Sequence, residues 1–262
     1  MKITSLIENT EGYPFCKTEH GLSLYIETNE YHILFDSGQT NLFAENAKTL
    51  GIDLRSIDFM ILSHGHYDHG GGIPTFTKIN PGAPIYMNQN AFEVHKHGKS
   101  KDIGLNPDIK QETNIIFTGD TYSINDGTRL YTCNTNKPKY PIQSCGLQVI
   151  RNGKTLSEDF IHEHYLEIKE NGKRILFSGC SHKGILNIMN WFKPDVLIGG
   201  FHLKEVQMNE KGKTWLDFLA IELNQYPTEY YTCHCTGIDQ YDYLKTRMKR
   251  LHYLHTGQSI VI

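Results

Sequence analysis

Six consecutive residues in the first third of the chain, His64 to His69, narrow the range of folds more than any other feature. They read His-Gly-His-Tyr-Asp-His, and three glycines follow at Gly70 to Gly72. The apolar run Phe59–Leu62 comes just before them, which predicts a short buried strand that leads into a histidine-rich loop. Neutral imidazole and carboxylate groups are good ligands for zinc, manganese and iron. The predicted metal ligands in this run are His64, His66, Asp68 and His69.

The spacing of these residues indicates how they are used. A turn that follows a strand can direct His64 and His66 toward one metal ion while Asp68 and His69 face a second. Gly70 to Gly72 allow tight turns and let the backbone pass close to neighbouring segments. A histidine-rich surface turn is the alternative interpretation, but four ligand-type residues within six positions disfavour it. A structural zinc site usually combines cysteines and histidines from two short knuckles, and this pattern is absent, so a catalytic metal is favoured.

Metal-binding residue types also follow other short strands. Four predicted strands end in loops that carry His, Cys or Asp, namely Asp36, His64–His69, Cys180–His182 and Cys233–Cys235. If these strand ends meet at one edge of the fold, their side chains converge, because rigid strands with functional loops commonly build a site. His202 lies at a further strand end, where a substrate contact or proton donor and a structural turn histidine are equally good interpretations.

The pattern of strands and helices favours an α/β sandwich with mixed sheets. The predicted helices cover Leu42–Leu50, Gly184–Phe192 and Trp215–Asn224. Asn171-Gly172 predicts a hairpin turn between two strands. We expect a single domain over residues 1–262, in which residues 74–160 are less regular and are interpreted as a lid or an insertion.

The composition narrows the expected partners. The formal net charge is -3 and no run of lysine or arginine stands out, so we expect a small-molecule substrate rather than nucleic acid or a membrane. The N-terminus lacks the apolar core of a signal peptide and no apolar run approaches the length of a membrane span, which makes the cytoplasm the expected location. The six cysteines form no CxxC pair and indicate no disulfide framework. The oligomeric state is left open.

The run from His64 to Gly72 resembles the signature of the metallo-β-lactamase superfamily. The agreement extends to Asp36, His182 and His234, so it covers most of the chain in order. Within the superfamily, the chain resembles the branch often labelled 7,8-dihydropterin-6-methyl-4-(β-D-ribofuranosyl)aminobenzene-5'-phosphate synthase. The segments that carry this second resemblance are Gly179–Ile185, Gly199–Leu203 and His234–Gly237.

This resemblance implies a four-layer αββα sandwich with two mixed β-sheets and with the metals between the sheets. The implied ligands are His64, His66 and His182 for the first metal and Asp68, His69 and His234 for the second. Asp36 would fix one of these histidines through hydrogen bonds. Zn²⁺ is the expected metal, with one or two ions per chain, and Mn²⁺ and Fe²⁺ are the alternatives.

The sequence departs from the superfamily pattern at Cys180. Many members carry a bridging Asp in a Gly-Asp pair after a strand, and here the comparable strand runs into Gly179-Cys180. Cys180 is a candidate thiolate ligand, and simple packing is the alternative. This departure leaves open whether two metals are bridged or a single ion binds. A di-iron, oxygen-reducing activity is disfavoured, because His66 stands where flavodiiron-type relatives carry Glu.

The function implied is that of a metal-dependent hydrolase in which metal-activated water attacks an ester, phosphoester or amide of a small molecule. Asp68 would orient the water and take part in proton transfer, and His202 is the candidate proton donor. The first alternative is a pterin-type synthase or transferase that displaces pyrophosphate, for which Lys183, Lys204 and the loop at 96–110 offer few basic groups. The second alternative is a non-catalytic metal-binding or redox module.

For other histidines and cysteines, the sequence gives weaker evidence of a role in the metal site. His95 and His97 are interpreted as a solvent-exposed pair in a polar loop, with an auxiliary metal site as the alternative. His162 and His164 are predicted on one face of a strand and are the reserve candidates for the third ligand of the first metal. Cys233 and Cys235 flank His234, and packing in the interior is favoured for them, with the alternative that one of the two points at the metal.

Overall fold

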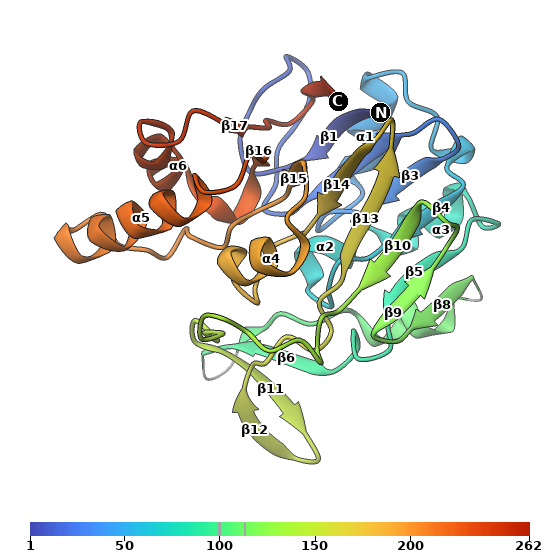
Figure 1. Ribbon diagram of the computed structural model, residues 1–262. Coiled ribbons are helices and arrows are strands. Elements are labelled where there is room, and N and C mark those ends of the chain that lie inside the picture. Colours follow the sequence, from blue (N-terminus) through green and yellow to red (C-terminus); the bar gives the residue numbers. More distant parts are fainter. Residues whose placement is uncertain (99–100, 113) are drawn as a thin grey trace.

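Two seven-stranded sheets lie face to face in the computed structural model, which describes residues 1–98, 101–112 and 114–262 (Figure 1). The elements in chain order are β1 (Lys2–Ile7), β2 (Ser23–Glu27), β3 (His32–Phe35), α1 (Leu42–Thr49), η1 (Leu54–Ser56), β4 (Phe59–Ile61), α2 (Tyr67–Gly70), α3 (Ile73–Ile79), β5 (Ile85–Asn88), β6 (Val94–His97), β7 (Lys101–Asp102), η2 (Pro107–Gln111), β8 (Ile115–Thr118), β9 (Thr121–Ser123), β10 (Thr128–Tyr131), β11 (Leu147–Arg151), β12 (Lys154–Ser157), β13 (Tyr165–Glu170), β14 (Lys173–Phe177), α4 (Ile185–Phe192), β15 (Val196–Ile198), α5 (Glu210–Leu223), β16 (Glu229–Thr232), η3 (His234–Thr236), α6 (Ile238–Lys245), β17 (Leu251–Tyr253) and β18 (Ser259–Val261).

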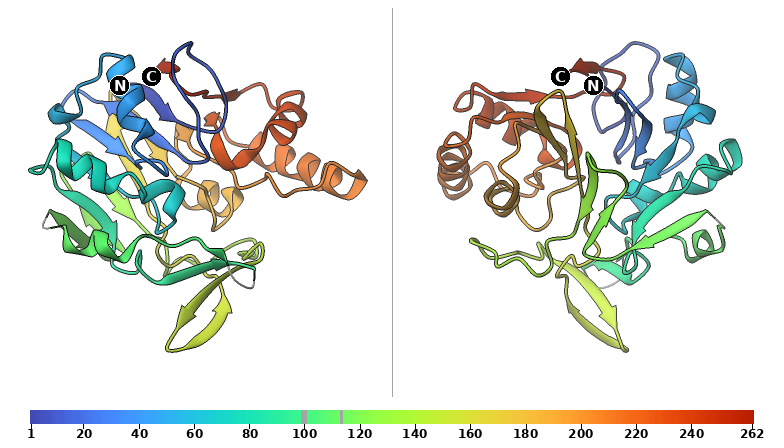
Figure 2. Two further views of the ribbon diagram at one scale, coloured as in Figure 1. Left: turned by 180° about the vertical axis from the view of Figure 1, so that it is seen from behind. Right: turned by 45° about the vertical axis from the view of Figure 1, so that its right-hand side comes forward.

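Both large sheets are mixed. The first has the strand order β18-β1-β2-β3-β4-β5-β8, and the second has the order β17-β16-β15-β14-β13-β10-β9. Strands β3, β4, β5 and β8 run parallel in the first sheet, and β14 to β17 run parallel in the second. The chain termini lie side by side (Figure 2), because the backbone N–H of Ile262 donates to the carbonyl of Met1 at 3.0 Å.

Apolar side chains from both sheets fill the space between them. Phe35 on β3 and Phe177 on β14 meet there with ring centroids 5.7 Å apart, and both are fully buried. On the outer side of the first sheet, α1 and α3 bury residues such as Phe43 and Phe76. On the outer side of the second sheet, α4, α5 and α6 do the same with residues such as Leu219. This arrangement confirms the predicted four-layer αββα sandwich.

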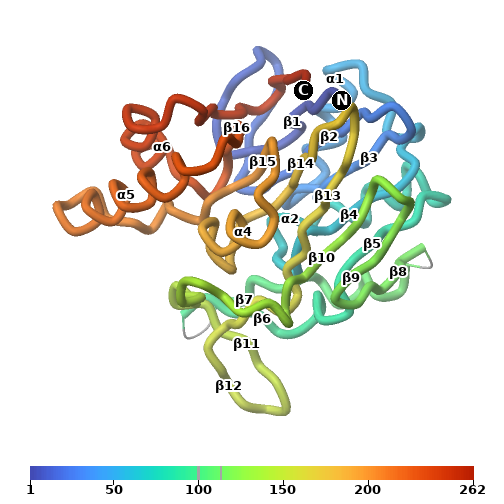
Figure 3. The backbone as a smooth tube through the Cα atoms, in the orientation of Figure 1, coloured from blue at the N-terminus to red at the C-terminus, as the bar shows by residue number. Residues whose placement is uncertain are grey.

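A third, smaller sheet extends the predicted architecture. Strands β12, β11, β6 and β7 form it, and the β11–β12 hairpin projects from the body of the molecule (Figure 3). The segment 74–160 also supplies β5 and β8 to the first sheet and β9 and β10 to the second. No helix within residues 1–98, 101–112 and 114–262 is long and apolar enough to cross a bilayer.

The local predictions differ from the structure at two places. Helix α5 begins at Glu210, where the Asn209 side chain accepts the N–H of Gly212 and caps it, so the helix starts five residues before the predicted Trp215. His162 and His164 lie in the turn before β13 rather than on a strand. The predicted hairpin at Asn171-Gly172 is confirmed, and both residues have the positive φ that its turn requires.

The parallel strands determine where the ligand-type residues go. Asp36, the His64 loop, Cys180, His202 and His234 all follow the carboxyl ends of parallel strands. Those ends lie at the same edge of each sheet, so the loops meet there.

Three of these residues hold strained backbone. The φ angles are +59° at Asp36, +53° at His202 and +51° at His234. Left-handed backbone is unfavourable for residues with a Cβ by roughly 1–2 kcal/mol each, and such positions concentrate at functional sites.

Candidate metal centre

The His64–His69 loop follows β4 and turns directly into the short helix α2. His64, His66, Asp68 and His69 are all buried, with at most 8% of any residue exposed. The backbone here is closely packed, since a Cβ at Gly65 would lie 2.0 Å from the carbonyl oxygen of Ala91. Only glycine fits at that position.

Asp36 holds two of these histidines in defined tautomers. Its Oδ2 accepts the Nδ1–H of His69 at 2.7 Å and the hydroxyl of Ser63 at 2.7 Å, and its Oδ1 accepts the backbone N–H of Ser63 at 2.7 Å. The Ser63 hydroxyl oxygen can then accept the Nδ1–H of His64 at 2.9 Å. In its neutral form, each imidazole therefore carries its proton on Nδ1 and presents an unprotonated Nε2. Burial lowers the pKa of His69, but Asp36 and Asp68 outweigh it and raise the value above the ordinary one.

The first set of donor atoms combines His64, His66 and His182. The Nε2 atoms of His64 and His182 lie 3.3 Å apart, and one nitrogen from each of the three residues falls within 4.8 Å of the others. Burial holds the pKa values of these three side chains well below the ordinary value, and neighbouring histidines lower them further, although Asp68 acts in the opposite direction on His66. The imidazoles are therefore neutral, which is the form that binds metals.

The second set combines Asp68, His69 and His234. The Nε2 of His234 lies 3.2 Å from the Nε2 of His69 and 3.4 Å from Oδ2 of Asp68. The side-chain oxygen of Asn9 accepts the Nδ1–H of His234 at 2.9 Å, so this Nε2 is also left unprotonated. Burial raises the pKa of Asp68, but His69, His20 and His234 outweigh it and hold the value well below the ordinary one.

These donor sets fit a divalent metal. Two nitrogens that bind one tetrahedral zinc at about 2.05 Å are roughly 3.3 Å apart, and this matches the two Nε2–Nε2 distances. Without a cation, two unprotonated nitrogens that face each other repel. Among the described residues, Nε2 of His66 and Nδ1 of His182 are buried and have no hydrogen-bond partner. The roles of the individual ligands stay predictions.

Cys180 lies between the two donor sets. Its Sγ is 3.2 Å from the Nε2 of His69, and it also groups with His64 and with His234 within ligand distance. Burial raises the pKa of the Cys180 thiol well above its ordinary value. A nearby cation would favour the thiolate, as it does for coordinating thiols in general.

Cys235 also lies in the site, whereas the sequence predicts packing in the interior. It lines the same cavity as Cys180 and accepts the backbone N–H of His202 at 3.3 Å. Its Sγ can bind the same ion as Cys180 and His234. Cys233, two residues earlier, is fully buried between the sheets. The alternation of a strand separates the two cysteines, but the sequence does not indicate which one faces the site.

His20 is a residue that the sequence does not single out. Its Nε2 lies 3.2 Å from Oδ2 of Asp68, and its ring centroid is 5.0 Å from that of His234. It stands in an irregular segment between β1 and β2, with no motif around it. Only the tertiary structure places His20 in the site, because the segment that carries it folds over the Asp68 carboxylate.

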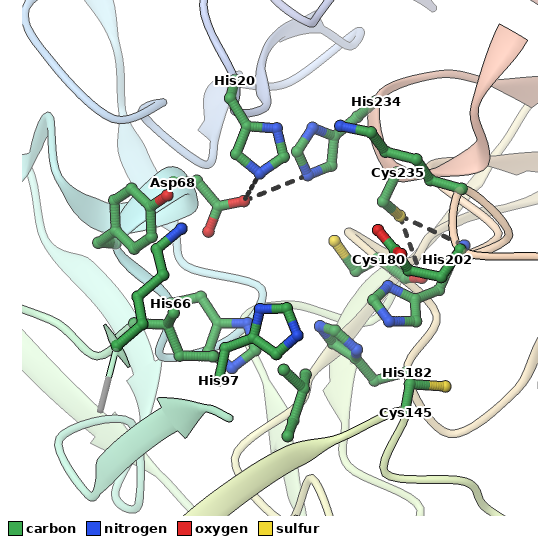
Figure 4. Close-up of a pocket in the computed structure, with 16 residues that line it drawn as sticks. His20, His66, Asp68, His97, Cys145, Cys180, His182, His202, His234 and Cys235 are labelled. Atoms are coloured by element: carbon green, nitrogen blue, oxygen red, sulfur yellow. Dashed lines mark hydrogen bonds and ion pairs between the residues drawn. The ribbon is translucent and has the colours of Figure 1, made fainter. Parts of the chain in front are cut away.

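His202 faces the cavity beside His182, with ring centroids 4.3 Å apart. Although burial lowers the pKa of His202, the nearby side chains of Cys145 and Cys235 raise it to about 10. The imidazole is therefore protonated near neutral pH. Figure 4 shows His202, His182, Cys180 and Cys235 on one side of the cavity and Asp68 and His66 on the other. The cavity has a volume of about 330 Å³.

Glu163 supports the loop that carries His182. Its carboxylate accepts the backbone N–H groups of His182 at 2.6 Å and Lys183 at 3.1 Å, and the hydroxyl of Tyr165 at 2.5 Å. The Lys183 ammonium donates to the carbonyl of Thr132 at 2.6 Å instead of reaching the cavity. Lys183 is thus a buried structural cation.

Three of the remaining histidines, His95, His162 and His164, differ from their predicted environments, whereas His97 is exposed as predicted. His95 is fully buried, not exposed, and donates Nδ1–H to Glu158 at 2.6 Å, whereas His97 is exposed at the cavity rim. His162 is buried beside His66 and accepts the backbone N–H of Gly65 through Nδ1 at 2.9 Å. This bond places the proton of neutral His162 on Nε2, which does not suit a metal ligand. His164 hydrogen-bonds to Thr118, away from the site.

The chain is similar to known proteins over most of its length. A family model described as the metallo-β-lactamase superfamily matches residues 17–220. An uncharacterized protein of Methanocaldococcus jannaschii is 28% identical, over 99% of this chain and 100% of its own length. A second protein of that organism is 30% identical, over 99% of this chain and 96% of its own, and is named 7,8-dihydropterin-6-methyl-4-(beta-D-ribofuranosyl)-aminobenzene-5'-phosphate synthase.

A solved structure is also similar over the whole chain. It is described as Tm1679, a metal-dependent hydrolase of the beta-lactamase superfamily. It superposes with a TM-score of 0.82 and 25% sequence identity, and the match covers 100% of this chain and 99% of that one.

Proposed function

The chain belongs to the metallo-β-lactamase superfamily, and on that premise we propose that it is a metal-dependent hydrolase that acts on an ester, phosphoester or amide of a small molecule. The observation that carries this proposal is that two buried sets of donor residues lie together, and that four of their members line one cavity, namely His66, Asp68, His182 and His234. A divalent cation, for which Zn²⁺ is our first choice, supplies Lewis acidity that activates water near neutral pH and stabilises oxyanion charge.

The residues around the cavity divide the proton transfers between them. Asp68 remains a carboxylate and, through the oxygen that His20 and His234 approach, can orient water and accept a proton. His202 remains protonated and can donate a proton to the leaving group. Two groups whose pKa values are shifted in opposite directions are suited to the roles of base and acid.

The first test measures metal-dependent hydrolysis of bis(4-nitrophenyl) phosphate and 4-nitrophenyl acetate by protein loaded with Zn²⁺, Mn²⁺ or Fe²⁺. We expect turnover that a chelator abolishes. Asp68→Asn should lower kcat by about 10²–10⁴-fold, the range of general acid–base catalysis. The matched control is His252→Ala, which removes a histidine on β17 that pairs with Glu229. Turnover that survives both chelator and Asp68→Asn would contradict the proposal, and metal binding without any turnover would favour a non-catalytic module.

A second candidate function, a synthase that displaces pyrophosphate from a pterin-type substrate, is supported by the 30% identity to the protein of that name. Lys101 and Lys204 line the cavity and could contact a diphosphate, whereas Lys183 is turned away from it. Pyrophosphate release from a dihydropterin methyl diphosphate in the presence of an aminobenzene ribofuranosyl phosphate would favour this activity. Hydrolysis of the generic esters with no pyrophosphate release would exclude it.

A further inference from the structure

A second cavity of about 570 Å³ lies beside the metal cavity. It is enclosed by α4, α5, the segment at 140–145 and the loop that follows β15. Three residues line both cavities, namely Cys145, His182 and His202. The two cavities therefore adjoin, and His202 stands where they meet. A molecule whose reacting group occupies the metal cavity can extend into the second one.

The walls of the second cavity are largely aromatic and aliphatic. The rings that line it belong to Tyr140, Phe201, Trp215 and Phe218. Trp215 and Phe218 lie on α5 with 41% and 42% of their surface exposed. Leu216 and Leu219 of the same helix pack into the core, and Leu219 also lines the cavity. Large apolar side chains that line a continuous concavity are typical of ligand sites.

The wall at Tyr140 is held in place before any ligand binds. The Asn187 side chain accepts the backbone N–H of Tyr140 at 2.8 Å and donates to its carbonyl at 2.9 Å. The Tyr140 hydroxyl donates to Glu222 on α5 at 2.8 Å. Its ring centroid lies 6.1 Å from that of Phe218 in an edge-to-face arrangement. A preformed wall lowers the ordering cost of binding.

We propose that this second cavity is the subsite for an aromatic group of the substrate, whose ester or phosphoester lies in the metal cavity. The inference rests on the proposed hydrolase function and extends it to a substrate class. Four ring side chains favour an aromatic over a small aliphatic group, because offset and edge-to-face ring contacts add to simple burial. Three amide side chains also line the cavity, namely Gln143, Gln207 and Asn209. They can donate hydrogen bonds to ring heteroatoms or accept hydrogen bonds from them.

Trp215 provides a direct readout of binding. The chain has two tryptophans, and a Trp191→Phe background leaves Trp215 as the single emitter. In that background we would titrate metal-loaded protein with 2-naphthyl phosphate and record Trp215 fluorescence. A saturable change is expected, and inorganic phosphate should compete with the probe without producing a change of its own.

The variant Phe218→Ala should weaken binding of 2-naphthyl phosphate about tenfold, the loss expected for one aromatic contact together with the apolar area that it covers. Ile221→Ala is the matched control, because Ile221 is on the same helix, is 64% exposed and does not line the cavity. It should bind the probe within about twofold of the background protein, since surface substitutions have small effects. Equal weakening in both variants, or none in either, would overturn the subsite.

Turnover separates this inference from the hydrolase proposal. Wild-type protein should have a higher kcat/KM for naphthyl than for methyl esters of the same phosphate, and Phe218→Ala should reduce that preference through KM. Binding of the probe that depends on Phe218, without hydrolysis, would leave the subsite in place and refute the hydrolase. Hydrolysis with the same kcat/KM for both esters would refute the subsite and leave the hydrolase in place.

Discussion

Asp36 is predicted to control metal affinity without touching a metal. Its carboxylate accepts Nδ1–H of His69 directly, and it orders the Ser63 hydroxyl that receives Nδ1–H of His64. One carboxylate therefore exposes the Nε2 lone pairs of a ligand in each donor set. The informative perturbation is Asp36→Asn, which keeps the shape of the side chain and replaces one acceptor oxygen with a donor amide.

The amide cannot satisfy all of these partners. The backbone N–H of Ser63 requires an acceptor at the Oδ1 position, so the amide nitrogen must occupy the Oδ2 position. That nitrogen donates toward Nδ1 of His69 and toward the Ser63 hydroxyl, which favours the tautomers of His69 and His64 that are protonated on Nε2. Metal binding must then reverse these tautomers. The metal-bound variant also lacks the charge-assisted hydrogen bond from His69 to the Asp36 carboxylate, which is worth about 1.5–3 kcal/mol. The corresponding loss of affinity is about 10–100-fold.

The assay is a titration of apo protein with Zn²⁺ against a competing chelator, repeated with Co²⁺ to follow ligand-field absorption. Asp58→Asn is the matched control, because Asp58 also accepts a backbone N–H, that of His32, but is exposed and distant from the ligands. Thermal unfolding of the apo proteins verifies that both variants fold. Unchanged metal affinity in folded Asp36→Asn protein would refute the tautomer reasoning.

Three further predictions concern the pH dependence of stability, the position of the ligand loop and the packing of the core. Burial holds the pKa of His164 at about 3, against an ordinary value of 6.5, so stability should rise as the pH increases from about 3 to 6.5. At pH 4.5 the unfolded chain binds a proton that the folded protein excludes, so His164 lowers the free energy of unfolding by about 2–3 kcal/mol. In urea titrations at pH 4.5 and 7, His164→Gln should therefore show a smaller pH dependence of stability than the wild type. The same pH dependence in both proteins would mean that His164 is not its cause. Gly65→Ala should displace the ligand loop, because its Cβ would lie 2.0 Å from the Ala91 carbonyl oxygen. We expect a metal titration to show a loss of affinity. An affinity equal to that of the wild type would show that the loop can adjust. Phe177→Ala should lower the free energy of unfolding by about 3–5 kcal/mol because it opens a cavity between the sheets, and a loss below about 1 kcal/mol in denaturant unfolding would mean that this core repacks.

The sequence by itself determined the ligand-rich loop and the architecture around it. The run from His64 to His69 is local, and the strand before it is recognisable from its apolar residues, so neither depends on long-range contacts. The alternation of strands and helices, together with the family resemblance, predicted the four layers. The sequence placed Asp36, Cys180 and His234 at strand ends, whose side chains converge if those ends meet at one edge. The structure shows that they do, because the strands run parallel and place their carboxyl ends together.

Only the tertiary structure decided which other side chains enter the site and what surrounds it. His20 reaches Asp68 from an irregular segment, and Cys235 rather than Cys233 faces the cavity. His95 is buried through its contact with Glu158, which is 63 residues away in the sequence. The aromatic cavity, likewise, joins segments that no local pattern connects. The physical reason is common to all of these cases: periodicity and propensity act over a few residues, whereas burial and contact depend on how distant segments pack.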